Sequence, residues 1–328
     1  MRMKLNRPNH YLLETKKKYT KGLYKMNAFI RLRDDIRRFI LSREMIFLKI
    51  WSALIAFVGL MCIKSNFGYN DTVSQLWVSI IITIISAFFP IQGVSLILLL
   101  VLLIDLAELG AQVALVALAL VVIGYLVCAY FRSKNTYNMV MVPVCYSFHS
   151  PYVMALGTGL MSNINELCSV ICGTVTAYYL HVIKNNAAAI LDETSDVSVF
   201  SLLNEQLLKS KMFYFFLAAM VAMFLVVYLL RQASINMSWI VANFAGVAVE
   251  FIIMIAGFLL TSQKGEIPGL ILGNIIVLVV GFILNYFILD LDYSRIEKVQ
   301  FEDDDYYYYV TAVPKIRIVE EEKEVKKI

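Results

Sequence analysis

The chain has 328 residues, of which 60% are hydrophobic and only 16% are charged, and its formal net charge is +4. Soluble proteins are about 45–50% apolar and about 25% charged, so this chain has more apolar residues than one core surrounded by water can bury. The composition excludes a water-soluble globular protein and indicates an integral membrane protein. It also argues against nucleic-acid binding, because the basic residues are concentrated in one terminal segment beside the first apolar stretch.

The charges are distributed unevenly and divide the chain into three parts. Residues 1–49 carry 14 Lys and Arg against 4 Asp and Glu, whereas residues 290–328 carry 7 against 11. A cleaved signal peptide has a short basic region before an apolar run of about 7–15 residues, but here a long, mostly polar segment comes first. We therefore expect a retained basic cytoplasmic arm over 1–44, a transmembrane domain over 45–289 and an acidic, Tyr-rich tail over 290–328.

Apolar segments long enough to cross a bilayer recur along the chain. A helix needs about 20 mostly apolar residues to cross a hydrocarbon core about 30 Å thick. The segments that meet this requirement are residues 45–63, 111–131, 167–183, 213–230, 239–260 and 269–289. Two shorter apolar segments, 76–89 and 91–104, are separated by Pro90 and are expected to be two tilted or extended crossings or a pair of half-helices.

Residues 139–160 are long enough to cross, but Pro143, His149, Ser150 and Pro151 interrupt them. Each proline removes a backbone hydrogen-bond donor, which predicts a broken or re-entrant element. A re-entrant element gives eight spans with both termini inside and 24 basic residues on the cytoplasmic side, whereas a full crossing gives nine spans and 20. Because the cytoplasmic side carries the excess of Lys and Arg, we predict an all-α polytopic helix bundle with eight spans and a re-entrant segment.

Three segments outside the spans have patterns of their own. Residues 29–40 alternate apolar and Arg positions at helical spacing, which predicts an interfacial helix on anionic lipid headgroups or a simple orientation signal. Residues 185–212 are predicted to form an amphipathic surface helix. Residues 296–302 and 306–318 flank the acidic run Asp303-Asp304-Asp305, which predicts a short β-hairpin in the tail.

The tail also carries the most distinctive sequence of the chain. It contains Asp292-Tyr293-Ser294-Arg295, then Val299-Gln300-Phe301-Glu302-Asp303-Asp304-Asp305-Tyr306-Tyr307-Tyr308-Tyr309-Val310, and then Ala312-Val313-Pro314-Lys315. In these residues, and more weakly around Arg231 and Trp239, the chain resembles a family of uncharacterised polytopic membrane proteins of clostridial Gram-positive bacteria. It departs from that family at Gln232, where members have a second arginine, and at Asn236, where they have an acid. The resemblance implies a Gram-positive plasma membrane and a shared architecture, and it implies no activity.

Motifs of soluble enzymes are missing from the sequence. It contains no Gly-rich phosphate loop ending in Gly-Lys-Ser/Thr, no His-Glu-x-x-His pair and no Gly-x-Ser-x-Gly turn. Only His10, His149 and His181 are available for metal or triad chemistry, and the five cysteines lie in apolar stretches. We expect no enzymatic activity, no cofactor and no metal site.

Glu250 is the strongest candidate for a functional residue. It lies near the middle of the span over 239–260, where a charged side chain is unfavourable by about 2.5–3.5 kcal/mol on insertion scales. It is either a protonatable site or ligand contact that faces the interior of the bundle, or a neutral, hydrogen-bonded acid that clamps two helices.

The interrupted segment supplies the other candidate binding residues, His149 and Ser150, and the polar run after it supplies Asn163, Asn165 and Glu166. Backbone groups freed by a break at membrane depth can bind a solute or an ion. The alternative is a proline kink followed by a surface loop. On the last span, Gly269-x-x-x-Gly273 and the pair Asn274 and Asn285 favour helix packing, either within the bundle or between two copies.

Two function hypotheses follow from the sequence. The first is a multi-pass plasma-membrane protein of transporter or channel type, whose path is organised by the break at residues 149–151 and by Glu250. The second is a non-transporting scaffold or permease-like subunit that recruits partner subunits through its terminal segments. Both place the chain in contact with the lipid bilayer, and the helix-packing motif leaves a homo-oligomer open.

Overall fold

The structure is a computed structural model that describes residues 32–33, 35–191, 199–233, 235, 237–288, 297–302 and 306–312. The chain divides into two compact units. One contains Leu48–Ile288, and the other contains the segments before and after it. The first unit holds the helix bundle and all the residues of the site described below.

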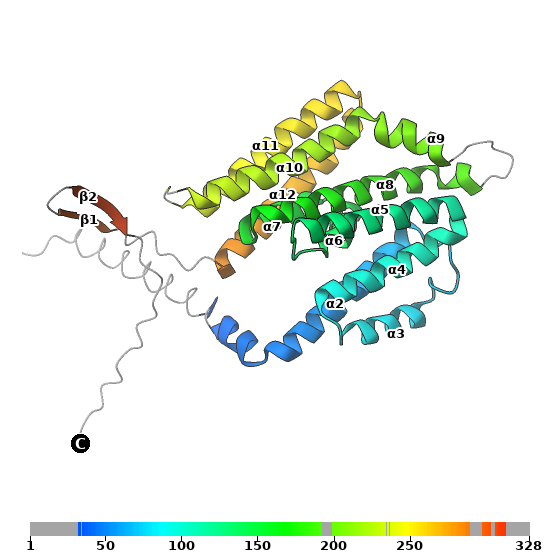
Figure 1. Cartoon of the computed structure of the whole chain (residues 1–328), viewed down its shortest axis with the longest axis horizontal. Coiled ribbons are helices and arrows are strands. Elements are labelled where there is room, and N and C mark those ends of the chain that lie inside the picture. Colours follow the sequence, from blue (N-terminus) through cyan, green and yellow to red (C-terminus); the bar gives the residue numbers. More distant parts are fainter. Residues whose placement is uncertain are drawn as a thin grey trace, which may run out of the picture. The chain divides into compact units, whose positions relative to one another are not determined.

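Among the described residues, seven helices are long and apolar enough to cross a membrane. They are α2 (Glu44–Asn66), α4 (Ile91–Leu109), α5 (Ala111–Tyr130), α8 (Leu167–Leu191, preceded by the 3₁₀ turn Ile164–Glu166), α10 (Lys211–Gln232), α11 (Ser238–Leu260) and α12 (Ile267–Ile288) (Figure 1). The shorter helical elements are α3 (Leu76–Ser86), α6 (Asn138–Ser147), α7 (Tyr152–Met161), α9 (Val199–Leu203), the π-helical turn Asn204–Leu208 and the 3₁₀ turn Lys264–Glu266. The prediction of an all-α polytopic bundle is confirmed.

The central helix of the bundle is α8. In its most apolar window 67% of the residues are buried, against 22–44% for the other long helices. It packs against α5, α6 and α10, and the hydroxyl of Tyr179 donates a 2.7 Å hydrogen bond to the backbone carbonyl of Val113 at the start of α5. Gly173 permits the contact with α6, because a Cβ atom there would lie 2.5 Å from the carbonyl oxygen of Asn138.

The bundle has two ends, which we name the Asn66 face and the Ile288 face. Helices α2, α4, α8 and α11 end at the Asn66 face, and α5, α10 and α12 end at the Ile288 face (Figure 1). The loop after α2 is tied to the end of α4, because the backbone N–H groups of Gly68 and Asn70 donate to the carboxylate of Asp105 at 3.0 and 2.9 Å. Helix α3 and the turn after it therefore carry the chain back from the Asn66 face before α4 returns, but the 11 residues of α3 extend only about 16 Å along the helix axis, which is less than the thickness of the hydrocarbon core.

Helices α6 and α7 form a re-entrant hairpin. The Asn135 amide donates to Ser162 Oγ at 2.7 Å, and the Asn138 amide donates to Ser169 Oγ at 2.8 Å. The start of α6 and the end of α7 therefore lie side by side at the Ile288 face, and the break between the two helices lies inside the bundle. The re-entrant alternative for residues 139–160 is therefore the one that the structure adopts.

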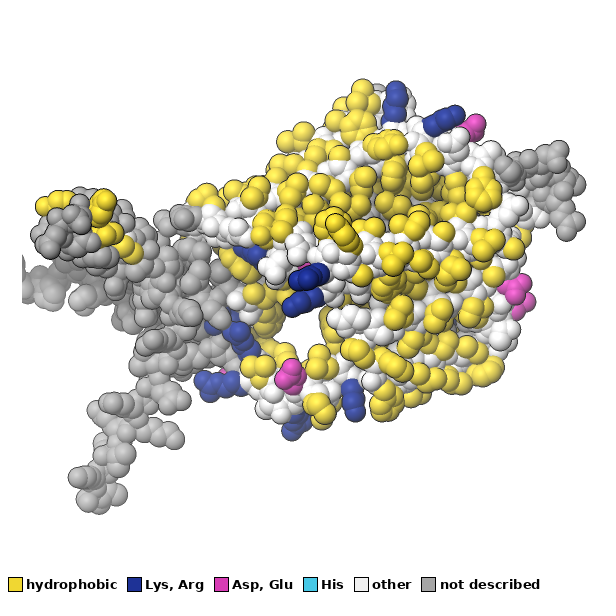
Figure 2. All heavy atoms as spheres, in the orientation of Figure 1, with side chains coloured by type: hydrophobic (Ala, Val, Ile, Leu, Met, Phe, Trp, Pro, Cys, Tyr) yellow, Lys and Arg dark blue, Asp and Glu magenta, His cyan; other side chains and the backbone are white. Residues whose placement is uncertain are grey.

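Hydrophobic side chains cover most of the visible face of the bundle, with few charged side chains among them (Figure 2). The short helix α3 illustrates this surface, since Trp77 is 60% exposed and Ile84 is 58% exposed. Apolar surface of this extent on helices of this length indicates contact with a lipid bilayer.

The predicted surface helix over 185–212 is present in a different form. Helix α8 continues past residue 183 to Leu191, residues 192–198 lie outside the described part, and α9 and the π turn follow. This segment packs back onto α8, because Asn186 and Gln206 exchange two side-chain hydrogen bonds of 2.7 and 3.1 Å.

In the second unit, β1 (Glu297–Glu302) and β2 (Tyr307–Ala312) form an antiparallel hairpin in which Phe301 lies opposite Tyr308. Both predicted strands are present, the second over a shorter range than expected. The acidic run Asp303–Asp305 and residues 313–328 lie outside the described residues, as does the basic arm up to residue 31.

Candidate functional site

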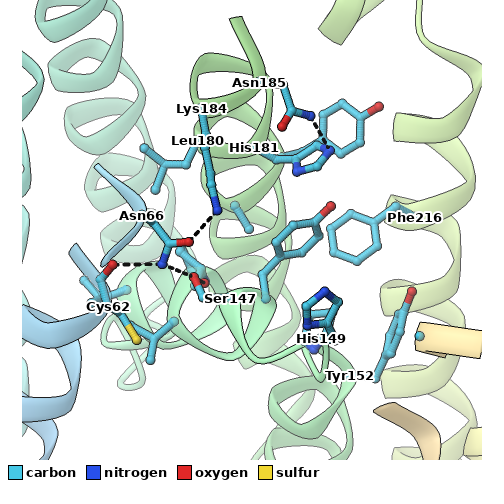
Figure 3. Close-up of a pocket in the computed structure, with 18 of the residues that line it drawn as sticks. Cys62, Asn66, Ser147, His149, Tyr152, Leu180, His181, Lys184, Asn185 and Phe216 are labelled. Carbon is cyan, nitrogen blue, oxygen red and sulfur yellow. Dashed lines mark hydrogen bonds between the residues drawn. The ribbon is translucent and has the colours of Figure 1, made fainter. Parts of the chain in front are cut away.

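A cavity of about 730 Å³ lies inside the bundle and contains residues of α2, α4, α6, α7, α8, α10, α11 and α12 (Figure 3). Its volume falls in the range of about 300–1,000 Å³ that is typical of small-molecule sites. Asn66 and Lys184, which lie toward the helix ends at the Asn66 face, line its upper part, and His149 and Tyr152 line its floor. Glu266, in the turn before α12, also belongs to the lining. The cavity therefore runs from the Asn66 face to the tip of the re-entrant hairpin.

The floor is shaped by an unusual backbone turn and by a glycine. His149 has a φ angle of +56°, in the left-handed region, which non-glycine residues adopt mainly where the chain must turn sharply. Helix α12 lies directly against this turn, because a Cβ atom at Gly273 would collide with the carbonyl oxygen of His149. The Gly269-x-x-x-Gly273 motif therefore packs within the bundle, against the re-entrant tip.

One wall of the cavity is polar. The Nζ atom of Lys184 on α8 donates a 2.7 Å hydrogen bond to Oδ1 of Asn66 on α2. The Asn66 amide in turn donates to Ser147 Oγ at 3.1 Å and to the backbone carbonyl of Cys62 at 2.8 Å. The lysine is exposed and has three ammonium donors, so its side chain can bind a ligand anion at this wall.

The opposite wall is aromatic. The ring of Tyr146 lies 5.3 Å from the imidazole of His181 and 5.5 Å from Phe216, and Phe216 lies 5.9 Å from Tyr152. The hydroxyl of Tyr178 is held by a 2.9 Å hydrogen bond with Ser210 Oγ. Aromatic faces at these separations offer a binding surface for an apolar or cationic group.

The cavity also has an acidic group. The carboxylate of Glu266, in the turn before α12, lies close enough to Tyr146 and His181 for an electrostatic interaction with both. The ammonium group of Lys184 lies close enough to interact with His181 as well. Within the described residues Lys184 and Glu266 lie on different elements of the lining. Among the described residues, the lining therefore presents a cation, Lys184, and a carboxylate, Glu266, with aromatic surface beside them.

Two predicted residues lie at the floor and a third lies directly behind it. His149 lines the cavity, and Ser150 beside it is 6% exposed. Glu250 is fully buried and interacts with the Tyr152 hydroxyl and with the Asn274 amide. Neither contact is a hydrogen bond, since both Glu250 oxygens lack a hydrogen-bond partner among the described residues. Glu250 therefore does not line the cavity itself, and among the described residues Tyr152 lies between it and the lining.

The other three predicted residues lie at the opposite face. The Glu166 carboxylate accepts hydrogen bonds from Ser133 Oγ and from the backbone N–H groups of Lys134 and Asn135 at 2.7 and 2.9 Å. Burial raises the pKa of Tyr137 in the same loop, and the nearby Glu166 carboxylate raises it further. This carboxylate fixes the loop before α6.

Asn163 and Asn165 are exposed at the Ile288 face. Helix α7 separates them from His149, because its 10 residues extend about 15 Å along the helix axis. The structure thus brings His149, Ser150 and Glu250 near one another, and it places Asn163, Asn165 and Glu166 elsewhere.

Several cavity residues were missed from the sequence. They are Asn66, Tyr146, Tyr178, His181, Lys184 and Glu266. Some of them lie near helix ends or in a turn, where polar side chains are ordinary, whereas Tyr178 and His181 lie inside α8, where no break in the helix marks them. One signal was available, since Tyr178, His181 and Lys184 follow one another at intervals of three residues and therefore share one face of α8.

No protein-family profile, curated protein or solved structure matches the chain. The interpretation of the cavity therefore depends on the residues that line it and on their contacts.

Proposed function

We propose that this integral membrane protein is a transporter that moves a small solute across the plasma membrane of a Gram-positive bacterium. The observation that carries the proposal is the cavity of about 730 Å³ that extends from the Asn66 face to the re-entrant tip. Many transporters bind their substrates near the middle of the bilayer, beside broken helices whose freed backbone groups contact the ligand.

A transporter is favoured over a channel because the cavity has a closed floor. Below His149 and Tyr152, helix α7 packs against α10, α11 and α12. Gly159 of α7 is in close contact with α10, since a Cβ atom there would lie 3.1 Å from the carbonyl oxygen of Phe224. A solute in the cavity can leave toward the Ile288 face only after a conformational change, which is the behaviour of alternating access.

The lining favours a zwitterionic solute with an apolar part. Lys184 suits a carboxylate, Glu266 suits an ammonium group, and the rings of Tyr146 and Phe216 suit an apolar side chain. Amino acids and short peptides combine these three features, so they are the first solutes to test.

The rival proposal is a scaffold or permease-like subunit, and the tail hairpin favours it. Tyr306 and Tyr307 are each 67% exposed beside a two-stranded sheet, and a sheet of two strands has two edges that another chain can extend. In this alternative the cavity holds no transported solute.

The two proposals differ in whether the cavity is occupied and emptied. The test uses a protein whose native cysteines are replaced and which carries Ser147→Cys on the cavity wall or Ser162→Cys at the Ile288 face as a matched control. We expect a pool of amino acids to slow thiol labelling at position 147 at least about fivefold, to leave position 162 unchanged, and to accumulate in proteoliposomes. Equal labelling with every pool, together with no accumulation of any amino acid, would favour the scaffold.

A further inference from the structure

Buried polar side chains follow the seam between α11 and α12. Within the described part of the chain, eleven buried side-chain atoms have no hydrogen-bond partner, and eight of them belong to Asn243, Glu250, Asn274 and Asn285. Asn243 and Glu250 are fully buried, and Asn274 and Asn285 are each 6% exposed. We call these four residues the polar file.

Helix geometry places the four residues along one line. Asn243 and Glu250 are seven residues apart on α11, and Asn274 and Asn285 are eleven apart on α12, so each pair shares one helix face within about 20°. Glu250 interacts with Asn274 across the seam. Further along, the Asn243 amide lies against Gly281, where a Cβ atom would be 2.8 Å from Nδ2.

The polar file begins at the floor of the cavity and continues toward the Ile288 face. At its first position, Glu250 interacts with Tyr152, which lines the floor. Asn243 and then Asn285 follow in the direction of the end of α12. Helix α7 covers the seam, since Leu156 lies 3.2 Å from the Cβ position of Gly281. The file spans about 16 Å, which is roughly half of the hydrocarbon core.

Packing alone does not account for these groups. A polar side chain buried in a membrane protein without a hydrogen-bond partner is strongly unfavourable, and a pair that only clamps two helices satisfies its own donors and acceptors. Polar groups in this condition are usually satisfied by water or by a bound ion. A carboxylate, amide oxygens and a phenol oxygen are hard ligands, which suit a proton or a small cation.

We infer that Glu250, Asn274 and Tyr152 bind a monovalent cation, either H⁺ or Na⁺, and that Asn243 and Asn285 line its path toward the Ile288 face. The titratable group that faces Glu250 from a neighbouring helix is Tyr152 on α7, while α12 contributes the neutral Asn274. Of the charged residues on α10, Lys211 and Arg231 lie at its two ends, away from Glu250. The inference goes beyond the proposed function and does not depend on any solute in the cavity; if transport occurs, this cation is the one that would drive it.

Two measurements on the purified full chain distinguish sodium from the proton. The first is thermal unfolding in nanodiscs as NaCl replaces choline chloride at constant ionic strength. A ligand that binds only the folded state raises Tm with the logarithm of its concentration, and we expect a rise of about 2 °C for each tenfold increase in Na⁺ above its Kd. The second is the infrared carbonyl band of protonated carboxylic acids after transfer into D₂O. If protonated Glu250 is open to water, its proton exchanges for deuterium at once. The carbonyl band of the acid then shifts while the protein stays folded.

Glu250→Gln should abolish whichever response the wild type shows, and Asn274→Leu should weaken it at least about tenfold. Glu108→Gln is the matched control, because Glu108 lies at the exposed end of α4, where it accepts a hydrogen bond from Asn70, and it should change neither readout. If Glu250→Gln does not fold, the same measurements are made on the Asn274→Leu variant alone.

A wild type with no sodium-dependent rise in Tm and an infrared band that stays unshifted in D₂O would overturn the inference. Glu250 would then be a neutral acid, closed to water, that holds two helices together. Labelling protection at position 147 is measured independently, so either proposal can fail without the other.

Discussion

Lys184 and Asn66 are 118 positions apart in the chain, and the hydrogen bond between them joins α8 to α2 across the upper part of the cavity. Asn66 also bonds to Ser147, so α2 is attached to α6 at the same point. Because the partner of the ammonium group is a neutral amide, an anionic group of a ligand competes effectively for it, since the anion adds an attraction between opposite charges that Asn66 does not supply. A carboxylate bound at Lys184 would therefore compete with the contact that joins α8 to α2.

The first prediction concerns this contact. Lys184→Met, which keeps the length of the side chain but removes its charge, should lower uptake of the solute at least about tenfold, which corresponds to about 1.4 kcal/mol of binding free energy. Asn66→Asp should also lower uptake, because a carboxylate at position 66 would occupy the ammonium group. The measurement is uptake into proteoliposomes. Normal uptake by Lys184→Met would remove Lys184 from the binding site.

The second prediction concerns the close approach of α12 to the re-entrant tip. Gly273→Ala places a methyl group against the backbone carbonyl of His149, which cannot move aside like a flexible side chain, so we expect a loss of about 1–3 kcal/mol of stability. Gly265→Ala is the matched control, because nothing lies within 4 Å of a Cβ atom there. Thermal unfolding in detergent measures both variants. Equal unfolding temperatures would show that the two elements do not approach this closely.

The architecture could be predicted from the sequence because its determinants are local. Length and hydropathy locate the long spans, and Pro143 and Pro151 mark the broken element, since a missing backbone donor acts on its own turn of helix. The hairpin follows from alternating β-branched and aromatic residues in the tail. The balance of Lys and Arg between the two sides also predicts an even number of crossings, which the labelling experiment described below tests.

The site could be predicted only in part, because its determinants are contacts between distant segments. His149 was found from the break, and Glu250 from the energy of an acid at membrane depth. Lys184 near the end of a span is indistinguishable in sequence from an ordinary interfacial lysine. Glu166 was grouped with His149 because the two are near in sequence, although the 10 residues of α7 separate them.

The third prediction concerns Glu166, whose carboxylate fixes the loop before α6. Glu166→Ala leaves the partly buried N–H groups of Lys134 and Asn135 without their acceptor, so we expect a loss of about 1–3 kcal/mol of stability. Asn165→Ala is the control, because that side chain is exposed beside Glu166. Thermal unfolding separates the two variants, and protection of a cysteine at position 147 by amino acids should persist in both. A loss of that protection in a stably folded Glu166→Ala protein would contradict the structural role and return Glu166 to the site.

The last prediction concerns the side of the membrane on which the cavity opens. With eight crossings, 24 of the 29 basic residues lie on the side of the termini, and cytoplasmic loops carry the excess of Lys and Arg, so we expect both termini in the cytoplasm and the Asn66 face outside. Single cysteines at Ser65, Gln263 and Thr311, each in a background without other cysteines, report the topology through a membrane-impermeant thiol reagent on intact cells. The probes at positions 65 and 263 should react at once, and the probe at 311 only after the membrane is permeabilised. Reaction of the 311 probe in intact cells, with no reaction at 263, would reverse the orientation. The cavity would then face the cytoplasm, and the conformation described here would be the one that releases an imported solute or captures an exported one.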